Sequence, residues 1–163
     1  MTEVTELTQQ CFFCKVLGDD SPARKVYEDE HCIGILDAKP ATPGHVLLVP
    51  KGHFKSMQEV PQQLLQHLFV VMKKISHALL RMFKTEGTSM FIANGQAAGQ
   101  RAPHFIMHIM PRHPNDHIKL APPRNKADPE GLEETRMLLT HRYEQQYEKQ
   151  RGTEQNTQSG DSS

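Results

Sequence analysis

Apolar residues recur at two spacings along this chain, and each spacing predicts a different kind of element. Between residues 61 and 84 they fall three and four positions apart, which predicts one long amphipathic helix. Short apolar runs bounded by turn-forming residues predict strands instead. The elements together predict an α+β fold, in which the long helix packs on a five-stranded, mainly antiparallel sheet. The predicted strands lie at 25–27, 32–36, 45–50, 88–93 and 104–110.

The two ends of the chain are polar and differ from this central part. The polar residues 1–10 are expected to form a flexible N-terminus. Residues 11–127 are expected to form one domain, which contains all the predicted strands and the long helix. Asp128 and Pro129 form a helix start, so an additional C-terminal helix is expected over 128–148. The Gln-, Thr- and Ser-rich residues 149–163 predict a disordered tail.

The composition excludes several classes of function. The chain has 163 residues, with 19 Lys and Arg against 19 Asp and Glu, so its formal net charge is zero. This balance argues against binding a nucleic-acid polymer or a charged membrane surface. No apolar stretch is long enough to cross a bilayer, and the first ten residues do not resemble a signal peptide. A cytoplasmic protein is therefore expected, in which three cysteines do not make a disulfide framework.

A short segment between Pro103 and Pro111 carries two histidines, His104 and His108. Histidines four apart can bind zinc from one face of a helix, but Phe105 stands where that protease pattern needs a glutamate. Seven residues between prolines are also the length of a strand. On a strand, His104, Ile106 and His108 share one face, because alternate side chains point the same way.

Four residues suit a metal ion. Tetrahedral zinc is commonly bound by thiols and imidazoles, and the chain offers the thiols of Cys11 and Cys14 and the imidazoles of His53 and His104. A zinc site with four protein ligands has no open position for catalysis and is therefore structural. The C-x-x-C pair alone also fits a redox pair, or two buried thiols beside core aromatics. Cys32 lies within an apolar run and is expected in the core.

The order and spacing of these motifs resemble the histidine triad (HIT) family of nucleotide-binding hydrolases and transferases. The resemblance covers about residues 11–113. It implies that Cys11, Cys14, His53 and His104 hold a structural zinc ion, as in the zinc-bearing branch of that family, and that the chain forms a homodimer. The matching stretches are CFFCKVLG, KVYEDEHCIGILDAKPATPGHVLLVPKGH and NGQAAGQRAPHFIMHIMPRH.

The chain departs from the family at the middle residue of the triad. The family pattern reads His-x-His-x-His, and its middle histidine attacks the α-phosphate to form a nucleotidyl-histidine intermediate. Here that position is Ile106, between His104 and His108. Isoleucine has no lone pair and cannot act as a nucleophile.

The resemblance also implies a nucleotide site. Asp37 matches the family's ribose ligand, and His108 matches its phosphate contact. Asn94 and Gln100 match residues near the ribose and phosphate, and Arg101 beside them is able to hold a phosphate through two N–H groups. The expected ligand is a nucleoside monophosphate or a nucleotide conjugate.

Three hypotheses follow for the function. The first is a zinc-stabilised nucleotide-binding protein that lacks the nucleotidyl-histidine mechanism. The second is a nucleoside phosphate hydrolase in which His108 or His113 acts as a catalytic base on water. The third is a non-enzymatic scaffold that uses its C-terminal helix and tail to bind a partner.

Overall fold

The computed structural model describes residues 11–18, 23–119 and 125–158, with side chains described as far as residue 147. The chain forms two compact units, Met1–Lys119 and Leu120–Ser163. The boundary at 119 lies close to the predicted one at 127. The predicted flexible N-terminus, 1–10, lies outside the described residues.

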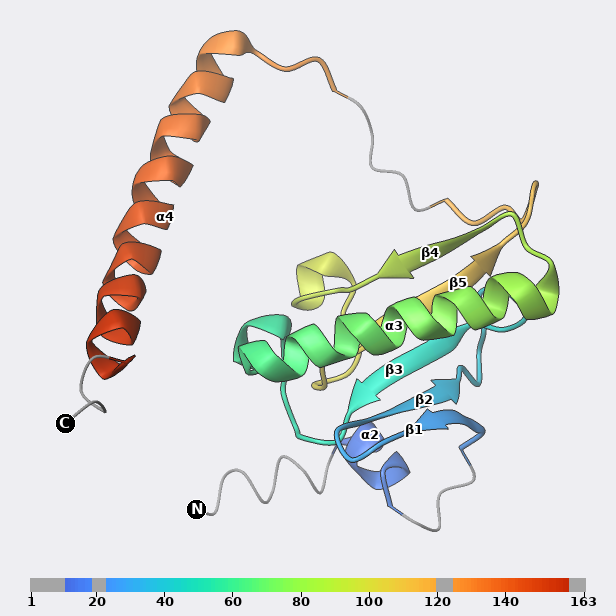
Figure 1. Cartoon of the computed structure of the whole chain (residues 1–163). Coiled ribbons are helices and arrows are strands. Elements are labelled where there is room, and N and C mark those ends of the chain that lie inside the picture. The colour runs from blue at the N-terminus through green and yellow to red at the C-terminus, as the bar shows by residue number, and fades with distance from the viewer. Residues whose placement is uncertain (1–10, 19–22, 120–124, 159–163) are drawn as a thin grey trace. The chain divides into compact units, whose positions relative to one another are not determined.

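A five-stranded sheet is the centre of the first unit (Figure 1). Its strand order is β1-β2-β3-β5-β4, and every neighbouring pair is antiparallel. The structure therefore confirms the predicted α+β class and the antiparallel five-stranded sheet. The strands are β1 (Lys25–Glu28), β2 (Cys32–Leu36), β3 (Val46–Pro50), β4 (Gly87–Phe91) and β5 (Met107–Arg112).

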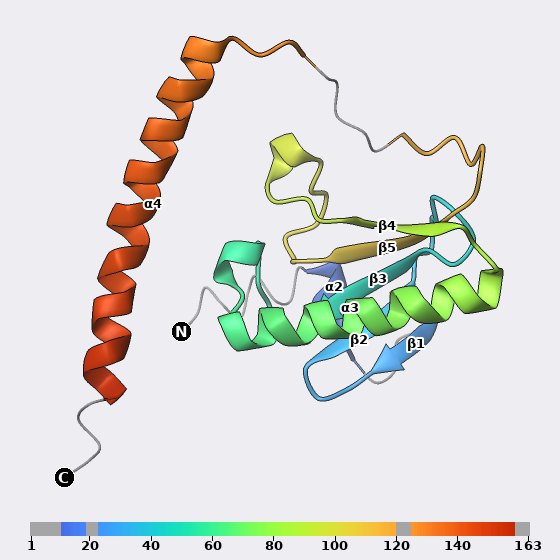
Figure 2. The same ribbon diagram turned by 45° about the horizontal axis from the view of Figure 1, so that its top comes forward.

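The long helix α3 (Gln62–Phe83) covers one face of this sheet (Figure 2). Its ends lie within one residue of the predicted ones, because the apolar stripe is continuous and Pro61 precedes the first turn. The stripe packs on alternate strand residues, which point to the same face. This core includes Leu68, Val71, Met72, Ile75 and Leu79 of α3, and Cys32, Val46, Leu48, Met107 and Ile109 of the strands.

Among the described residues, the short helix α2 (Phe12–Val16) packs on one end of the opposite face of the sheet. Phe13 and Val16 pack there on the other set of alternate strand residues, Ile33, Ile35, Leu47 and Val49. Five residues are too few for a stable isolated helix, so this packing holds α2 in place.

One predicted strand begins later than expected. The sequence predicts a strand over 104–110, whereas β5 starts at Met107. The backbone N–H of Phe105 donates a 2.6 Å hydrogen bond to the carbonyl oxygen of Phe54, in the loop after β3. Phe105 is thus bound to a loop, and His104 lies just before the strand.

Helix α4 (Pro129–Gln158) forms the second unit and is longer than predicted. The sequence places its end at 148 and a disordered tail at 149–163, whereas the helix continues to Gln158, and residues 159–163 lie outside the described residues. Its added residues include Gln, Glu, Lys and Arg, which are good helix formers. In the part of the chain that the structure describes, no helix is apolar and long enough to cross a membrane.

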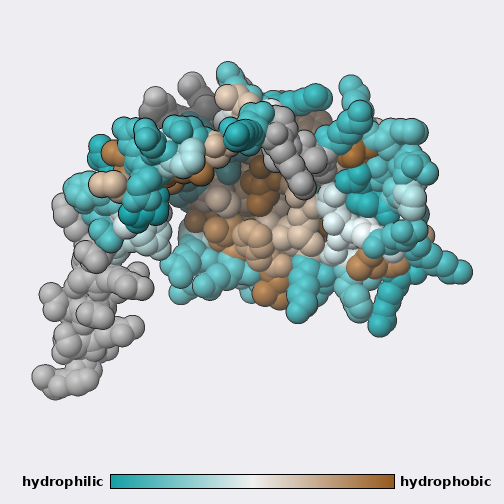
Figure 3. Space-filling view, turned by 90° about the horizontal axis from the view of Figure 1, so that it is seen from above, coloured by the Kyte–Doolittle hydropathy of each residue, from teal (hydrophilic) through white to brown (hydrophobic). Residues whose placement is uncertain are grey.

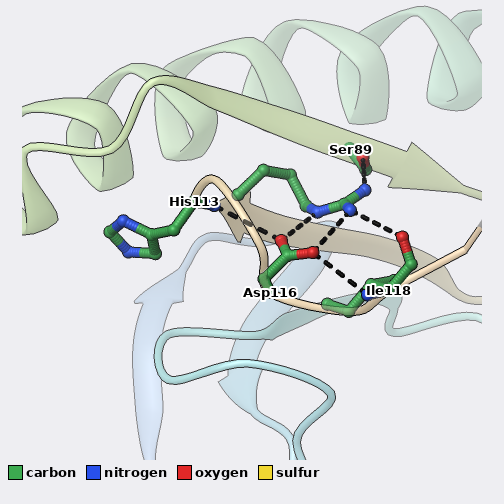
Figure 4. A network of polar contacts seen from close by, with 5 residues as sticks. Ser89, His113, Asp116 and Ile118 are labelled. Atoms are coloured by element: carbon green, nitrogen blue, oxygen red, sulfur yellow. Dashed lines mark hydrogen bonds and ion pairs between the residues drawn. The ribbon is translucent and has the colours of Figure 1, made fainter.

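A network around Arg112 fixes the segment that follows β5 (Figure 4). The guanidinium binds both carboxylate oxygens of Asp116 and donates to the hydroxyl of Ser89 and the carbonyl of Ile118. Two parallel N–H···O bonds are the strongest form of this ion pair. The side chain of His113 points away from this network (Figure 4).

The carboxylate of Asp29 joins the β1–β2 turn to helix α3. One oxygen lies 2.7 Å from both the hydroxyl of Tyr27 and Nε2 of His67, and the other accepts the backbone N–H groups of His31 and Cys32. Burial alone raises the pKa of Asp29, but these hydrogen bonds outweigh burial and hold that pKa well below its usual range.

Replacing this carboxylate should destabilise the protein in a pH-dependent way. We expect Asp29→Ala to lower the free energy of unfolding at pH 7 by about 1–3 kcal/mol, because four donors lose their acceptor. A carboxylate with a depressed pKa stabilises the fold above its unfolded pKa of about 4, and loses this effect as the pH falls towards the folded pKa. The gap between the wild type and the variant should therefore shrink between pH 5 and pH 2.5.

Urea unfolding of both proteins over this pH range tests the prediction. Asp29→Asn is the matched control, because its side-chain oxygen can still accept the two backbone N–H groups, so it should lose less stability than Asp29→Ala. A gap that stays the same at low pH would show that the charge of Asp29 has no part in stability.

Candidate functional site

Four side chains that are distant in sequence meet where α2 lies against the sheet. Cys11 and Cys14 belong to the start of α2, His53 follows β3, and His104 precedes β5. Their ligand atoms all lie within 4.8 Å of one another. The structure thus brings together all four residues predicted to hold a metal ion.

The separations inside this cluster suit zinc. Sγ of Cys14 lies 3.1 Å from Nδ1 of His53 and 3.7 Å from Nδ1 of His104, and Sγ of Cys11 lies 3.5 Å from Nδ1 of His104. Neighbouring ligands of tetrahedral zinc, with Zn–S of about 2.3 Å and Zn–N of about 2.0 Å, lie about 3.5 Å apart. The cluster is therefore compatible with a zinc ion bound by two thiolates and two Nδ1 atoms.

Two details of the surroundings bear on this fit. Nε2 of His104 lies 3.1 Å from the carbonyl oxygen of Pro50, and an N–H there leaves Nδ1 free to bind a metal. Burial, with Cys11 beside it, raises the pKa of the Cys14 thiol to about 11. Zinc binding would displace these thiol protons, because zinc binds the thiolate form.

A second polar group, formed by Asp37, His45 and His108, lies on the same face of the sheet. Nε2 of His45 lies 3.0 Å from Nδ1 of His108, and Nδ1 of His45 lies 3.4 Å from a carboxylate oxygen of Asp37. Burial lowers the pKa of both histidines, and the neighbouring His45 lowers that of His108 further. Both shifts favour the neutral form of the rings near pH 7.

His45 is the member of this group that the sequence analysis missed as a site residue. His108 pairs with Leu47 of β3, so His45, two residues earlier, points to the same face beside it. Asp37 lies opposite His45, with its backbone N–H bonded to the His45 carbonyl. The only signal in the sequence was a histidine at the start of an otherwise apolar strand, and its partner depends on the strand register.

Ile106 lies between His104 and His108 in the chain and packs on the apolar cluster beneath α2. That cluster includes Leu47 and Val49, which lie on the face of the sheet opposite α3. The residue at the predicted nucleophile position is therefore a partly buried alkyl side chain.

The predicted loop residues differ in how free their side chains are. Gln100 donates to the carbonyls of Lys55 and Ala102 and accepts the N–H of Gly95, so its amide is already used to shape the loop. The side-chain oxygen of Asn94 accepts the backbone N–H of Met57. Arg101 is exposed, and its guanidinium forms no hydrogen bond or ion pair with other residues in the described part of the chain.

His113, the other predicted base, lies in the exposed segment after β5. Its backbone N–H donates to Asp116. Within the described residues, its side chain has no hydrogen bond to Asp37, His45 or His108. The geometry therefore joins His108, and not His113, to a neighbouring titratable group.

The antiparallel sheet, the segment with His104 and His108, and the Cys/His cluster agree with the HIT-type domain that the sequence predicts. The HIT domain model matches residues 19–115, which is more than half of the chain. The chain therefore belongs to the HIT domain family.

Three known proteins illustrate this similarity. The crystal structure of a HIT family member from Bacillus subtilis has a TM-score of 0.75 and 34% identity, and the match covers 82% of this chain and 96% of that one. A Zn-bound histidine triad family protein from Mycobacterium smegmatis has a TM-score of 0.65 and 32% identity, with 76% and 88% coverage. Adenylylsulfatase HINT3 from Arabidopsis thaliana is 35% identical over 114 residues, which are 70% of this chain and 58% of that protein.

Proposed function

We propose that this protein binds a nucleoside monophosphate or a nucleotide conjugate, that a structural zinc ion stabilises it, and that it does not use the nucleotidyl-histidine mechanism. The observation that carries this proposal is the packed Ile106 at the nucleophile position, beside an intact His108 and Asp37. The chain thus keeps groups that can bind a nucleotide and lacks the one that attacks phosphorus.

The relatives support parts of this proposal. One neighbour of the same fold is described as Zn-bound, and the two cysteines and two histidines found here are ligands that tetrahedral zinc prefers. The Arabidopsis relative is named an adenylylsulfatase, so an adenine nucleotide conjugate is a suitable first probe.

Titration calorimetry with AMP, GMP, CMP and adenylyl sulfate tests binding directly. We expect micromolar affinity for at least one nucleotide, without release of product in a parallel assay by chromatography. If none of these nucleotides binds to the zinc-loaded protein, the proposal fails.

Asp37 provides a test of which residues bind the nucleotide. We expect Asp37→Ala to weaken binding roughly 10- to 100-fold, because a hydrogen bond from a ribose hydroxyl to a carboxylate contributes about 1.5–3 kcal/mol. Glu30→Ala is the control, since Glu30 is an exposed carboxylate in the β1–β2 turn. Equal affinity in wild type and Asp37→Ala would remove Asp37 from the site.

The same assays separate the alternative functions. If His108 or His113 activates water as a base, the wild type should turn over its substrate. This turnover should then be lost in His108→Ala or in His113→Ala, respectively. A scaffold predicts no nucleotide binding, with a partner held by the exposed apolar side chains of α4. These include Leu132, Leu139, Tyr143 and Tyr147.

The homodimer expected from the family resemblance is also part of the proposal. A space-filling view towards the β4 side shows an apolar area framed by hydrophilic side chains (Figure 3). Helix α3 contacts β4 through a hydrogen bond between Ser76 and Thr88. Phe69 lies two helical turns before Ser76 on α3, and Met90 lies on the same face of β4 as Thr88. Phe69 and Met90 are both exposed and would be buried in a dimer formed along this edge. Sedimentation of wild type and of Met90→Glu tests this.

A further inference from the structure

A backbone N–H group points at one end of the pair formed by His45 and His108. The N–H of Ala41 donates a 3.2 Å hydrogen bond to Nδ1 of His45. A ring nitrogen that accepts a hydrogen bond carries no proton, so a neutral His45 must carry its proton on Nε2. His45 is 5% exposed, and burial lowers its pKa, which keeps the ring neutral.

This arrangement also determines the tautomer of His108. Nε2 of His45 lies 3.0 Å from Nδ1 of His108, so the proton on Nε2 is donated to Nδ1. A neutral His108 must then carry its own proton on Nε2. Nε2 of His108 has no hydrogen-bond partner in the described part of the chain. It is also not fully buried, because the buried atoms without a partner there are His53 Nε2 and Thr85 Oγ1. It is therefore open to the site.

We propose that His45 is a positioning residue, which holds His108 in its Nε2–H tautomer so that His108 presents a hydrogen-bond donor, and not a base, to the phosphate of a bound ligand. The assignment of the ligand rests on the proposed function above. The tautomer itself rests only on the contacts of Ala41, His45 and His108.

Within the described ranges, the carboxylate of Asp37 favours the opposite arrangement. A proton on Nδ1 of His45 would be donated to Asp37, His108 would then donate from Nδ1, and its Nε2 would become a base. That arrangement places the Ala41 N–H against another N–H and loses its hydrogen bond. The Asp37 oxygen also lies 3.4 Å from His45 Nδ1, beyond the usual hydrogen-bond range, while the other oxygen accepts the N–H of Lys39 at 2.9 Å.

The donor tautomer agrees with the absence of a nucleophile. A neutral N–H can hold a phosphate oxygen, but it cannot take a proton from water. His108 in this form therefore contributes to binding without hydrolysis, and hydrolysis by His108 as a base needs the less favoured tautomer.

Nitrogen NMR of the histidine rings in the zinc-loaded full chain tests the proposal without a ligand. We expect both His45 and His108 to show a protonated Nε2 and an unprotonated Nδ1 at pH 7.5. A protonated Nδ1 on His108 in the wild type overturns the proposal. Because no nucleotide is present, this result is independent of whether the protein binds one.

Two variants of His45 then test its role. His45→Phe keeps a ring but removes the donor, so His108 should become a mixture of tautomers and AMP affinity should fall about fivefold. His45→Gln retains an N–H that can reach His108, so it should keep the Nε2–H tautomer. His77→Gln, at an exposed position of α3, is the control for both. An unchanged His108 tautomer in correctly folded His45→Phe would show that His45 does not position it.

Discussion

Chelation of zinc from the metal-loaded protein is expected to lower its melting temperature by roughly 10 °C. A metal present at about 1,000 times its dissociation constant adds about 4 kcal/mol to stability, and each kcal/mol changes the melting temperature of a domain of this size by about 2–4 °C. The physical reason is that the ion joins α2 to two segments of the sheet that are far apart in sequence. His53 and His104 are 39 and 90 residues from Cys14.

Two cysteine variants separate the metal from ordinary packing. Cys14→Ser should melt lower than wild type and lose its response to the chelator, because it lacks a zinc ligand. Cys32→Ala removes a thiol buried in the core against α3 and should also melt lower. It should keep the full response to the chelator, because Cys32 lies outside the group formed by Cys11, Cys14, His53 and His104 and belongs to a different group, with Asp29 and His67. A melting curve that stays the same after the metal has demonstrably been removed would refute a structural role for zinc.

The variant Ile106→His is expected to release a nucleoside monophosphate from adenosine phosphoramidate at least 100 times faster than wild type. Loss of the nucleophile in an enzyme of this kind of chemistry costs several orders of magnitude in rate, so its return should produce a large gain. The introduced imidazole would attack the α-phosphorus while the P–N bond breaks, and the nitrogen would leave as ammonia after taking up a proton from Nε2–H of His108 or from water. Water would then cleave the new P–N bond and regenerate the ring.

Ile106→Gln is the matched control, since it introduces a polar side chain of similar length without a nucleophilic ring nitrogen. Nucleotide affinity is measured on all three proteins, and mass spectrometry of the quenched reaction detects the covalent nucleotidyl intermediate. Turnover in the wild type would contradict our interpretation of Ile106. If none of the three proteins shows turnover although all of them bind the nucleotide, the site lacks more than a nucleophile.

Much of this fold follows from short-range patterns in the sequence. The apolar stripe of α3 and the alternating strands depend on neighbouring residues, so the sequence predicts them closely. The four possible metal ligands were also found from their residue types and family resemblance, and Ile106 was identified in the same way. None of these predictions required knowledge of which strands are neighbours.

Other features depend on contacts between distant segments. Helix α2 is too short for a periodic pattern and is held by packing under the sheet. The pairing of His45 with His108, 63 residues apart, follows from the register of β3 on β5. The sequence also did not indicate that the Gln100 amide forms hydrogen bonds to Gly95 and Lys55.

The sequence by itself therefore determined the elements, their class and the chemical types available at the site. The tertiary structure decided which of these groups meet and which nitrogen of each histidine is free. The physical reason is that a helix or strand pattern depends on residues close together in the sequence. A hydrogen bond between His45 and His108 instead requires β3 and β5 to pair in one particular register.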